Sequence, residues 1–166
     1  MFNPKIFLTA LLFLTTSVVS DTLEVRAPAA PGLTYLYSVN CTLASPIPVG
    51  TGPHGTRLVI PIIGGTFSGP NLSGKVLDLG ADWGLLDRAG TFSADTRYQL
   101  QTDDGAHIFV RTSGPAQKDG NLHLRIVFET GSVKYFWLNN VVAVGFLKQG
   151  RGYVLIDAWQ LESPRG

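Results

Sequence analysis

The stretch HLRIVFET, residues 123–130, alternates between apolar side chains and mostly polar ones. Successive side chains of a β-strand point to opposite faces of the sheet, so Leu124, Ile126 and Phe128 would share one face. The opposite face would carry His123, Arg125, Val127 and Glu129. AHIFVRTS, residues 106–113, repeats the pattern, with Ala106, Ile108 and Val110 on the apolar side. Both stretches therefore predict half-buried β-strands.

Similar short runs of β-branched and aromatic residues fill the rest of the chain, separated by turn-forming sequences such as SGPNLSG and TDDGA. We expect strands at about 33–44, 57–67, 73–79, 91–102, 106–113, 121–130, 134–147 and 152–161. No helical periodicity lasts for more than a turn or two. The pattern predicts an all-β fold, a single antiparallel β-barrel of about eight strands, because closure removes unpaired strand edges. A two-sheet β-sandwich is the alternative.

The N-terminal twenty residues have the layout of a secretory signal peptide, with Lys5 before an apolar run and small residues before Ser20. The alternative, an uncleaved membrane anchor, is disfavoured because the apolar run is shorter than the ~20 residues that a spanning helix needs. We expect a signal peptide at 1–20, a flexible segment at 21–32, a barrel domain at 33–161 and a tail at 162–166. The predicted location is outside the cell or in the lumen of the secretory pathway.

The charge of the chain gives no case for nucleic acid as a partner. The full sequence has 13 basic and 12 acidic residues, and removal of the leader takes away Lys5, so the mature chain is close to neutral. Basic surfaces are what nucleic acids and anionic membranes require. A composition of 45% hydrophobic and 15% charged residues is that of a globular protein. These values favour a neutral or hydrophobic small molecule as the partner, with no membrane span after leader removal.

Cys41 is the single cysteine of the sequence, so an intrachain disulfide is impossible. Burial of the thiol is the expected state, and a disulfide to a second chain is the alternative. It lies inside one of two N-glycosylation sequons, at Asn40; the other is at Asn71, in the predicted turn GPNLSG. We expect Asn71 to be the better acceptor, because a turn is exposed.

The motif LGADWG, residues 79–84, places one carboxylate beside one indole between two glycines. One interpretation is that Asp82 is an acid or base at the barrel mouth, its pKa raised by Trp83 and by exclusion of water. The other is that Asp82 closes an Asx turn and Trp83 plugs one end of the barrel. The sequence favours the turn but does not exclude the acid.

Several other polar residues are set among apolar strand positions. Asp157 shares a predicted face with Trp159 in YVLIDAWQL and is a second candidate acid. Arg57 and Tyr98 are candidates to stabilise a developing anion. The candidates for ligand binding are Trp83, Arg111, Glu129, Tyr135, Trp137 and Asn139. For the charged residues, an internal ion pair is the structural alternative, and for Tyr and Asn it is a hydrogen bond to the backbone.

The sequence offers no support for a metal or a cofactor. His54, His107 and His123 lie far apart and have no ligand partners at metal-binding spacing. The glycine pairs match neither the GxGxxG nor the GxxxxGK[ST] pattern, and no hydroxyl lies in a nucleophile elbow. We therefore expect neither cofactor nor covalent catalysis.

The ordered series RLVIPIIGGTFSGPNLSG (57–74), LGADWG (79–84), RYQLQTDDGAHIFV (97–110), FETGSVKYFWLNNVVAVG (128–145) and YVLIDAWQL resembles the family called domain of unknown function 3237. The resemblance covers about residues 33–161. It implies a compact antiparallel β-barrel of the kind found in ligand-holding calycins. It implies no activity.

Two hypotheses of function follow. The first is a cofactor-free isomerase or cyclase that holds a hydrophobic metabolite in an aromatic-lined cavity, with Asp82 or Asp157 as the acid or base. Such an enzyme would catalyse an accessory step of fungal natural-product assembly. The second is a non-catalytic secreted protein that sequesters a ligand or contacts another surface. Both fit the leader and the neutral charge.

Overall fold

The computed structural model describes residues 27–164, and almost all of them belong to one antiparallel β-sheet. The predicted signal peptide at 1–20 lies outside the described residues. The strands are β1 (Gly32–Leu43), β2 (Ile47–Gly52), β3 (Gly55–Ser68), β4 (Ser73–Leu86), β5 (Phe92–Thr102), β6 (His107–Pro115), β7 (Leu122–Glu129), β8 (Ala143–Gln149) and β9 (Tyr153–Glu162). A 3-10 helix, η1 (Phe136–Asn140), interrupts them before β8.

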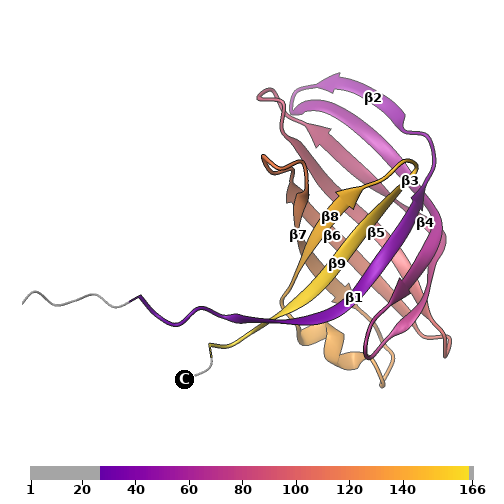
Figure 1. Ribbon diagram of the computed structural model, residues 1–166. Helices are drawn as coiled ribbons and strands as arrows, with labels where there is room; N and C mark the ends of the chain where they lie inside the picture. The colour runs from indigo at the N-terminus through magenta and orange to yellow at the C-terminus, as the bar shows by residue number, and fades with distance from the viewer. Residues whose placement is uncertain (1–26, 165–166) are drawn as a thin grey trace, which may run out of the picture.

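The sheet closes on itself to form a barrel. The strand order is β1-β9-β8-β7-β6-β5-β4-β3-β2, and β1 also pairs with β3. This second pairing joins Ser38 to Ser68 and Thr42 to Gly64, which completes a ring of eight strands and leaves β2 outside it. Figure 1 shows β2 curving over one end of the barrel. The predicted barrel of about eight strands is confirmed.

The alternation that predicted the strands also sets the inside of the barrel. In β7, Leu122, Leu124, Ile126 and Phe128 are buried while every residue between them is exposed. In β5, alternate residues from Ala94 to Thr102 are buried in the same way. One face of each strand therefore fills the lumen, and the other faces solvent.

Three local predictions differ from the structure. The sequence IPVGTG forms the additional strand β2, which was not predicted because all of its residues are exposed and its two glycines are typical of loops. The strand predicted at 73–79 continues to Leu86, so LGADWG lies inside β4 and not at a turn. The strand predicted at 134–147 begins at Ala143, because residues 136–140 form η1.

The end of the barrel near η1 is filled with aromatic side chains. The ring of Tyr37 packs edge-on against Phe67 and Phe128, at centroid distances of 5.9 and 6.0 Å. Tyr135 and Leu138 are buried beside them. Figure 1 shows η1 across this end, opposite the end that carries β2. Among the described residues, no helix is long and apolar enough to cross a membrane.

Candidate functional site

Asp82 lies on the inner face of β4, between β3 and β5. It pairs with Ile60 on one side and with Thr96 on the other. The backbone N–H of Asp95 donates a hydrogen bond of 2.9 Å to Oδ1 of Asp82. The carboxylate thus accepts a backbone N–H, but the donor is on the neighbouring strand and not in a local Asx turn. The closed barrel, rather than a turn, fixes the direction of this side chain.

The two glycines around Asp82 have separate steric roles. A Cβ atom at Gly80 would lie 2.4 Å from the carbonyl oxygen of Arg97, so a side chain there would push β4 away from β5. A Cβ atom at Gly84 would lie 2.3 Å from the ring of Phe92. Gly80 therefore permits close strand pairing, and Gly84 provides the space that Phe92 occupies.

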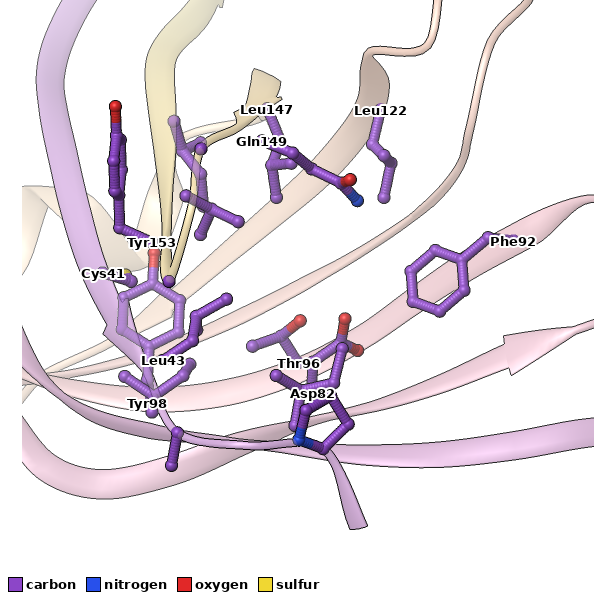
Figure 2. Close-up of a pocket in the computed structure, with 18 residues that line it drawn as sticks. Cys41, Leu43, Asp82, Phe92, Thr96, Tyr98, Leu122, Leu147, Gln149 and Tyr153 are labelled. Atoms are coloured by element: carbon purple, nitrogen blue, oxygen red, sulfur yellow. The ribbon is translucent and has the colours of Figure 1, made fainter. Parts of the chain in front are cut away.

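A cavity of about 260 Å³ opens at the barrel end opposite η1, and Asp82 is part of its wall (Figure 2). Most of its lining is apolar. The aliphatic and aromatic lining side chains are Leu43, Ala44, Pro46, Ile60, Ile62, Phe92, Leu122, Leu147, Val154 and Ile156. Polar groups come from Asp82, Thr96, Tyr98, Gln149 and Tyr153. Among the described residues that line the cavity, Asp82 is the one carboxylate, which makes it the candidate for proton transfer.

Burial in this apolar wall raises the pKa of Asp82 above its ordinary value. The Asp95 N–H and the Thr96 hydroxyl act in the opposite direction, since they stabilise the carboxylate, while the nearby charge of Asp95 adds a smaller increase. Burial is the largest of these effects. The carboxyl group of Asp82 is therefore protonated more readily in this site than it would be in water.

The inner end of the cavity is formed by Tyr98 and Cys41, with Tyr37 behind them. Tyr37 and Tyr98 interact through their hydroxyl groups, but neither hydroxyl makes a hydrogen bond of regular geometry within the described residues. Burial raises the pKa of both phenols well above their usual value. It also raises the pKa of the Cys41 thiol to about 12, so the thiol is neutral and a poor nucleophile.

Trp83 and Arg57, two of the predicted site residues, lie outside the lumen. Trp83 forms a shallow outer groove with Leu79 and Phe109, and the guanidinium of Arg97 stands 5.5 Å from the centre of its ring. Arg57 donates a hydrogen bond of 2.6 Å from Nη1 to the carbonyl oxygen of Trp83. The structure therefore does not bring these two side chains together with Asp82 in the cavity.

The remaining charged candidates also face outward. Arg111 is 3.6 Å from the carboxylate of Asp95, so its ion-pair partner is not one of the predicted residues. Asp157 accepts a short hydrogen bond from the hydroxyl of Ser38 and borders a groove on the outer surface. Glu129 is exposed at the end of β7. None of the three lines the cavity.

Tyr135, Trp137 and Asn139 lie at the closed end of the barrel. The Tyr135 hydroxyl donates to the carboxylate of Asp104 at 3.2 Å, and Trp137 packs against the core. The side chain of Asn139 accepts from the N–H of Thr130 and donates to its carbonyl oxygen, both at 2.9 Å. The contacts of Asn139 match the structural alternative, a hydrogen bond to the backbone, whereas the partner of Tyr135 is the side chain of Asp104.

The sequon residues Asn71 and Asn40 are both exposed, in the turn between β3 and β4 and on β1. Cys41, beside Asn40, is buried with a free thiol, as expected. Within residues 27–164, no group of three or more His, Cys, Asp and Glu side chains has the arrangement of a metal site.

The sequence analysis missed Thr96, Phe92, Gln149 and Tyr153 of the cavity. A signal was present for Gln149. It follows Ala143, Gly145 and Leu147 at two-residue spacing, which assigns it to the same face of β8. The alternation was lost because the predicted strand began nine residues too early, at 134, and ended at Leu147.

Comparison with known proteins identifies relatives over most of the chain. The family described as "Protein of unknown function (DUF3237)" matches residues 31–121. The hydroalkoxylation enzyme phnH of Penicillium herquei is 32% identical over 135 residues, which cover 81% of this chain and 87% of that enzyme. A β-barrel-like protein of Acinetobacter baumannii superposes with a TM-score of 0.76 at 36% identity, over 84% of this chain and 100% of that one. A crystal structure of an enzyme from Penicillium herquei gives a TM-score of 0.72 at 31% identity, with coverage of 84% and 100%.

Proposed function

We propose that this chain, which belongs to the family described as "Protein of unknown function (DUF3237)", is a β-barrel enzyme. Its reaction would add a hydroxyl group across a carbon–carbon double bond within one small molecule. The observation that carries the proposal is Asp82, a carboxyl group with a raised pKa in the wall of an apolar cavity. The likeness to a fungal hydroalkoxylation enzyme supports the class of reaction. An intramolecular addition of this kind is an isomerisation that closes an oxygen-containing ring.

The reaction needs a proton donor and a proton acceptor but no oxidant or reductant. The carboxylic acid of Asp82 gives its proton to one carbon of the double bond, and the hydroxyl oxygen of the substrate forms a C–O bond with the other carbon. The proton lost by that oxygen returns to the Asp82 carboxylate through water at the open mouth. A raised pKa suits this role, because more of the group is protonated near neutral pH.

The apolar wall contributes by holding the substrate in a folded conformation. Leu147 and Leu122 lie across the cavity from Asp82 in Figure 2, so a bound molecule is confined between aliphatic side chains and the acid. Bringing the hydroxyl and the double bond together in this way removes rotational freedom before the reaction, which lowers the barrier. A volume of about 260 Å³ accommodates one or two rings with short substituents.

The test uses 2-(2-methylallyl)phenol, which closes to its isomer 2,2-dimethyl-2,3-dihydrobenzofuran. We expect wild-type protein to accelerate this closure above the rate in buffer, and Asp82→Asn to lower the accelerated rate by about 10²–10⁴-fold, the usual contribution of an acid or base. The rate should also fall as the pH rises above the raised pKa of Asp82. Chromatography of the two isomers measures both.

Asp78→Asn, on the exposed part of β4, is the matched control and should keep the wild-type rate. Full activity in Asp82→Asn, or loss of activity in Asp157→Asn instead, would contradict the proposal. Tight binding of the phenol without any acceleration would also contradict it and would favour the non-catalytic ligand-binding function.

A further inference from the structure

Gln149 occupies the last inward-facing position of β8. Ala143, Gly145 and Leu147 are buried at two-residue intervals, and the residues between them are exposed or half-buried. The next position of the same series is Gln149, which lines the cavity together with Leu147. Its direction toward the lumen therefore follows from the strand register and does not depend on a side-chain rotamer alone.

β8 and β4 lie on opposite sides of the barrel. In the ring of eight strands, β8 is reached from β4 through β5, β6 and β7 in one direction and through β3, β1 and β9 in the other. It is thus four strands away either way. Figure 2 shows the amide of Gln149 pointing into the cavity on the side opposite to Asp82 and Thr96. A ligand in the cavity would lie between the amide and the carboxyl group.

The other polar side chains deep in the cavity already have neighbours. The Thr96 hydroxyl interacts with Asp82, and the hydroxyl of Tyr98 is buried against Tyr37. The Gln149 amide has no hydrogen-bond partner among the described residues. The hydroxyl of Tyr153, which also lines the cavity, points away from Asp82 and Thr96 in Figure 2, so the Gln149 amide is the neutral polar group directed into the mouth that remains available to a ligand.

We propose that Gln149 binds the hydroxyl group of the substrate and presents its oxygen to the double bond from the side opposite to Asp82. This inference rests on the proposed function and deepens it. The side-chain carbonyl of Gln149 accepts a hydrogen bond from the O–H of the substrate. A lone pair of that hydroxyl oxygen is then directed at the double bond of the same molecule. Asp82 protonates one carbon, the oxygen bonds to the other, and the released proton passes to water at the mouth.

The arrangement also defines the class of substrate. The hydroxyl group must lie at the mouth, next to Gln149, while the apolar part extends inward toward Leu122 and Ile156. An alkenyl phenol or alkenyl alcohol with one polar end meets this requirement. A molecule with a charged group at its inner end does not, because no countercharge is present among the residues that line that end.

The experiment measures binding with probes that cannot react, the saturated pair 2-isobutylphenol and isobutylbenzene. Wild-type protein should bind the phenol about tenfold more tightly than the hydrocarbon, as expected for one hydrogen bond in a partly buried site. Gln149→Leu should remove this preference, and Gln149→Glu, which keeps an acceptor oxygen, should retain it. Isothermal titration or ligand-observed NMR gives both dissociation constants.

Lys148→Ala, at the neighbouring outward-facing position, is the matched control and should leave the preference unchanged. Since Gln149 is exposed, its variants should have the wild-type melting temperature. A phenol preference that survives in Gln149→Leu overturns the inference while leaving the proposed function intact. If the preference disappears in Asp82→Asn but not in Gln149→Leu, the hydroxyl binds at Asp82, and the inference is also overturned.

Failure of the proposed function gives a different result. In that case ring closure of 2-(2-methylallyl)phenol is not accelerated, whereas the binding preference and its dependence on Gln149 persist with the saturated probes. The two experiments therefore separate an error in the reaction from an error in the role of Gln149.

Discussion

The two ends of the barrel are built from the same alternating strands but are filled differently. The closed end, around Tyr37, Phe67, Phe128 and η1, is packed with aromatic rings. The open end, around Asp82 and Gln149, is lined mainly by smaller aliphatic side chains and keeps a cavity of about 260 Å³. The difference shows that inward-facing residues of one barrel can serve stability at one end and ligand binding at the other. Asp82 lies at the open end, where space is available beside it.

The largest expected effect comes from changing the side-chain volume at each end. Phe128→Ala removes a ring from the packed end and should lower the free energy of unfolding by about 3–5 kcal/mol. Ile60→Trp adds volume to the open end and should abolish binding of 2-isobutylphenol at a smaller cost in stability. Chemical unfolding and titration of the probe measure the two outcomes. Similar losses of stability in both variants would show that the open end is packed as tightly as the closed one.

A smaller loss is expected from Gly84→Ala. The added Cβ atom would lie 2.3 Å from the Phe92 ring, so the ring must move, at a cost of about 1–3 kcal/mol in unfolding free energy. Because Phe92 lines the cavity, binding of the probe should weaken as well. Gly131→Ala serves as the control, since nothing lies within 4 Å of a Cβ atom built there. An unchanged midpoint of urea unfolding in Gly84→Ala would refute this role.

The pH dependence of the free energy of unfolding should show the raised pKa of Asp82 at the open end. Burial raises the pKa of Asp82 in the folded protein, so the folded state binds more protons than the unfolded state between the ordinary and the raised pKa. The free energy of unfolding should therefore fall as the pH rises through this window. Asp82→Asn should lack this loss and become the more stable protein toward neutral pH, as measured by urea unfolding at a series of pH values. Identical pH profiles would contradict the raised pKa.

The smallest effect is expected from Tyr37, in the closed end, and from Tyr98, at the inner end of the cavity. The buried hydroxyls of Tyr37 and Tyr98 lack regular hydrogen bonds, so each already bears a desolvation cost. Tyr37→Phe and Tyr98→Phe should each change the free energy of unfolding by no more than about 1 kcal/mol. A loss of several kcal/mol in thermal unfolding would show that the two phenols form a strong hydrogen bond.

The barrel itself could be predicted from the sequence because alternation is a local signal. The inward series Leu124, Ile126 and Phe128 was correct, and so was the closure expected from eight strands. β2 could not be predicted, because its residues are all exposed and its backbone is held by pairing with β3 alone. η1 was mistaken for a strand because the apolar residues around it resemble strand residues, whereas Asn139 fixes it through hydrogen bonds to Thr130.

The candidate site could be predicted only in part. Asp82 and Tyr98 were proposed from their surroundings in the sequence, and both line the cavity. Trp83 was grouped with Asp82 because it is the next residue in the motif, and Arg57 because it is a charged residue among apolar strand positions, but both lie on the outer face. The inward direction of Gln149 could have been read from the two-residue spacing of β8, but the position of β8 opposite β4 depends on the closed ring, which no local pattern contains.

The role of Asp82 is tested most directly by the pKa of its carboxyl group, measured by NMR with and without bound 2-isobutylphenol. We expect a pKa above the ordinary value in the free protein and a further increase in the complex, because the probe excludes water from the cavity. A pKa at the ordinary value, or one that does not respond to the bound probe, would contradict the claim that Asp82 is the acid of a ligand-binding cavity.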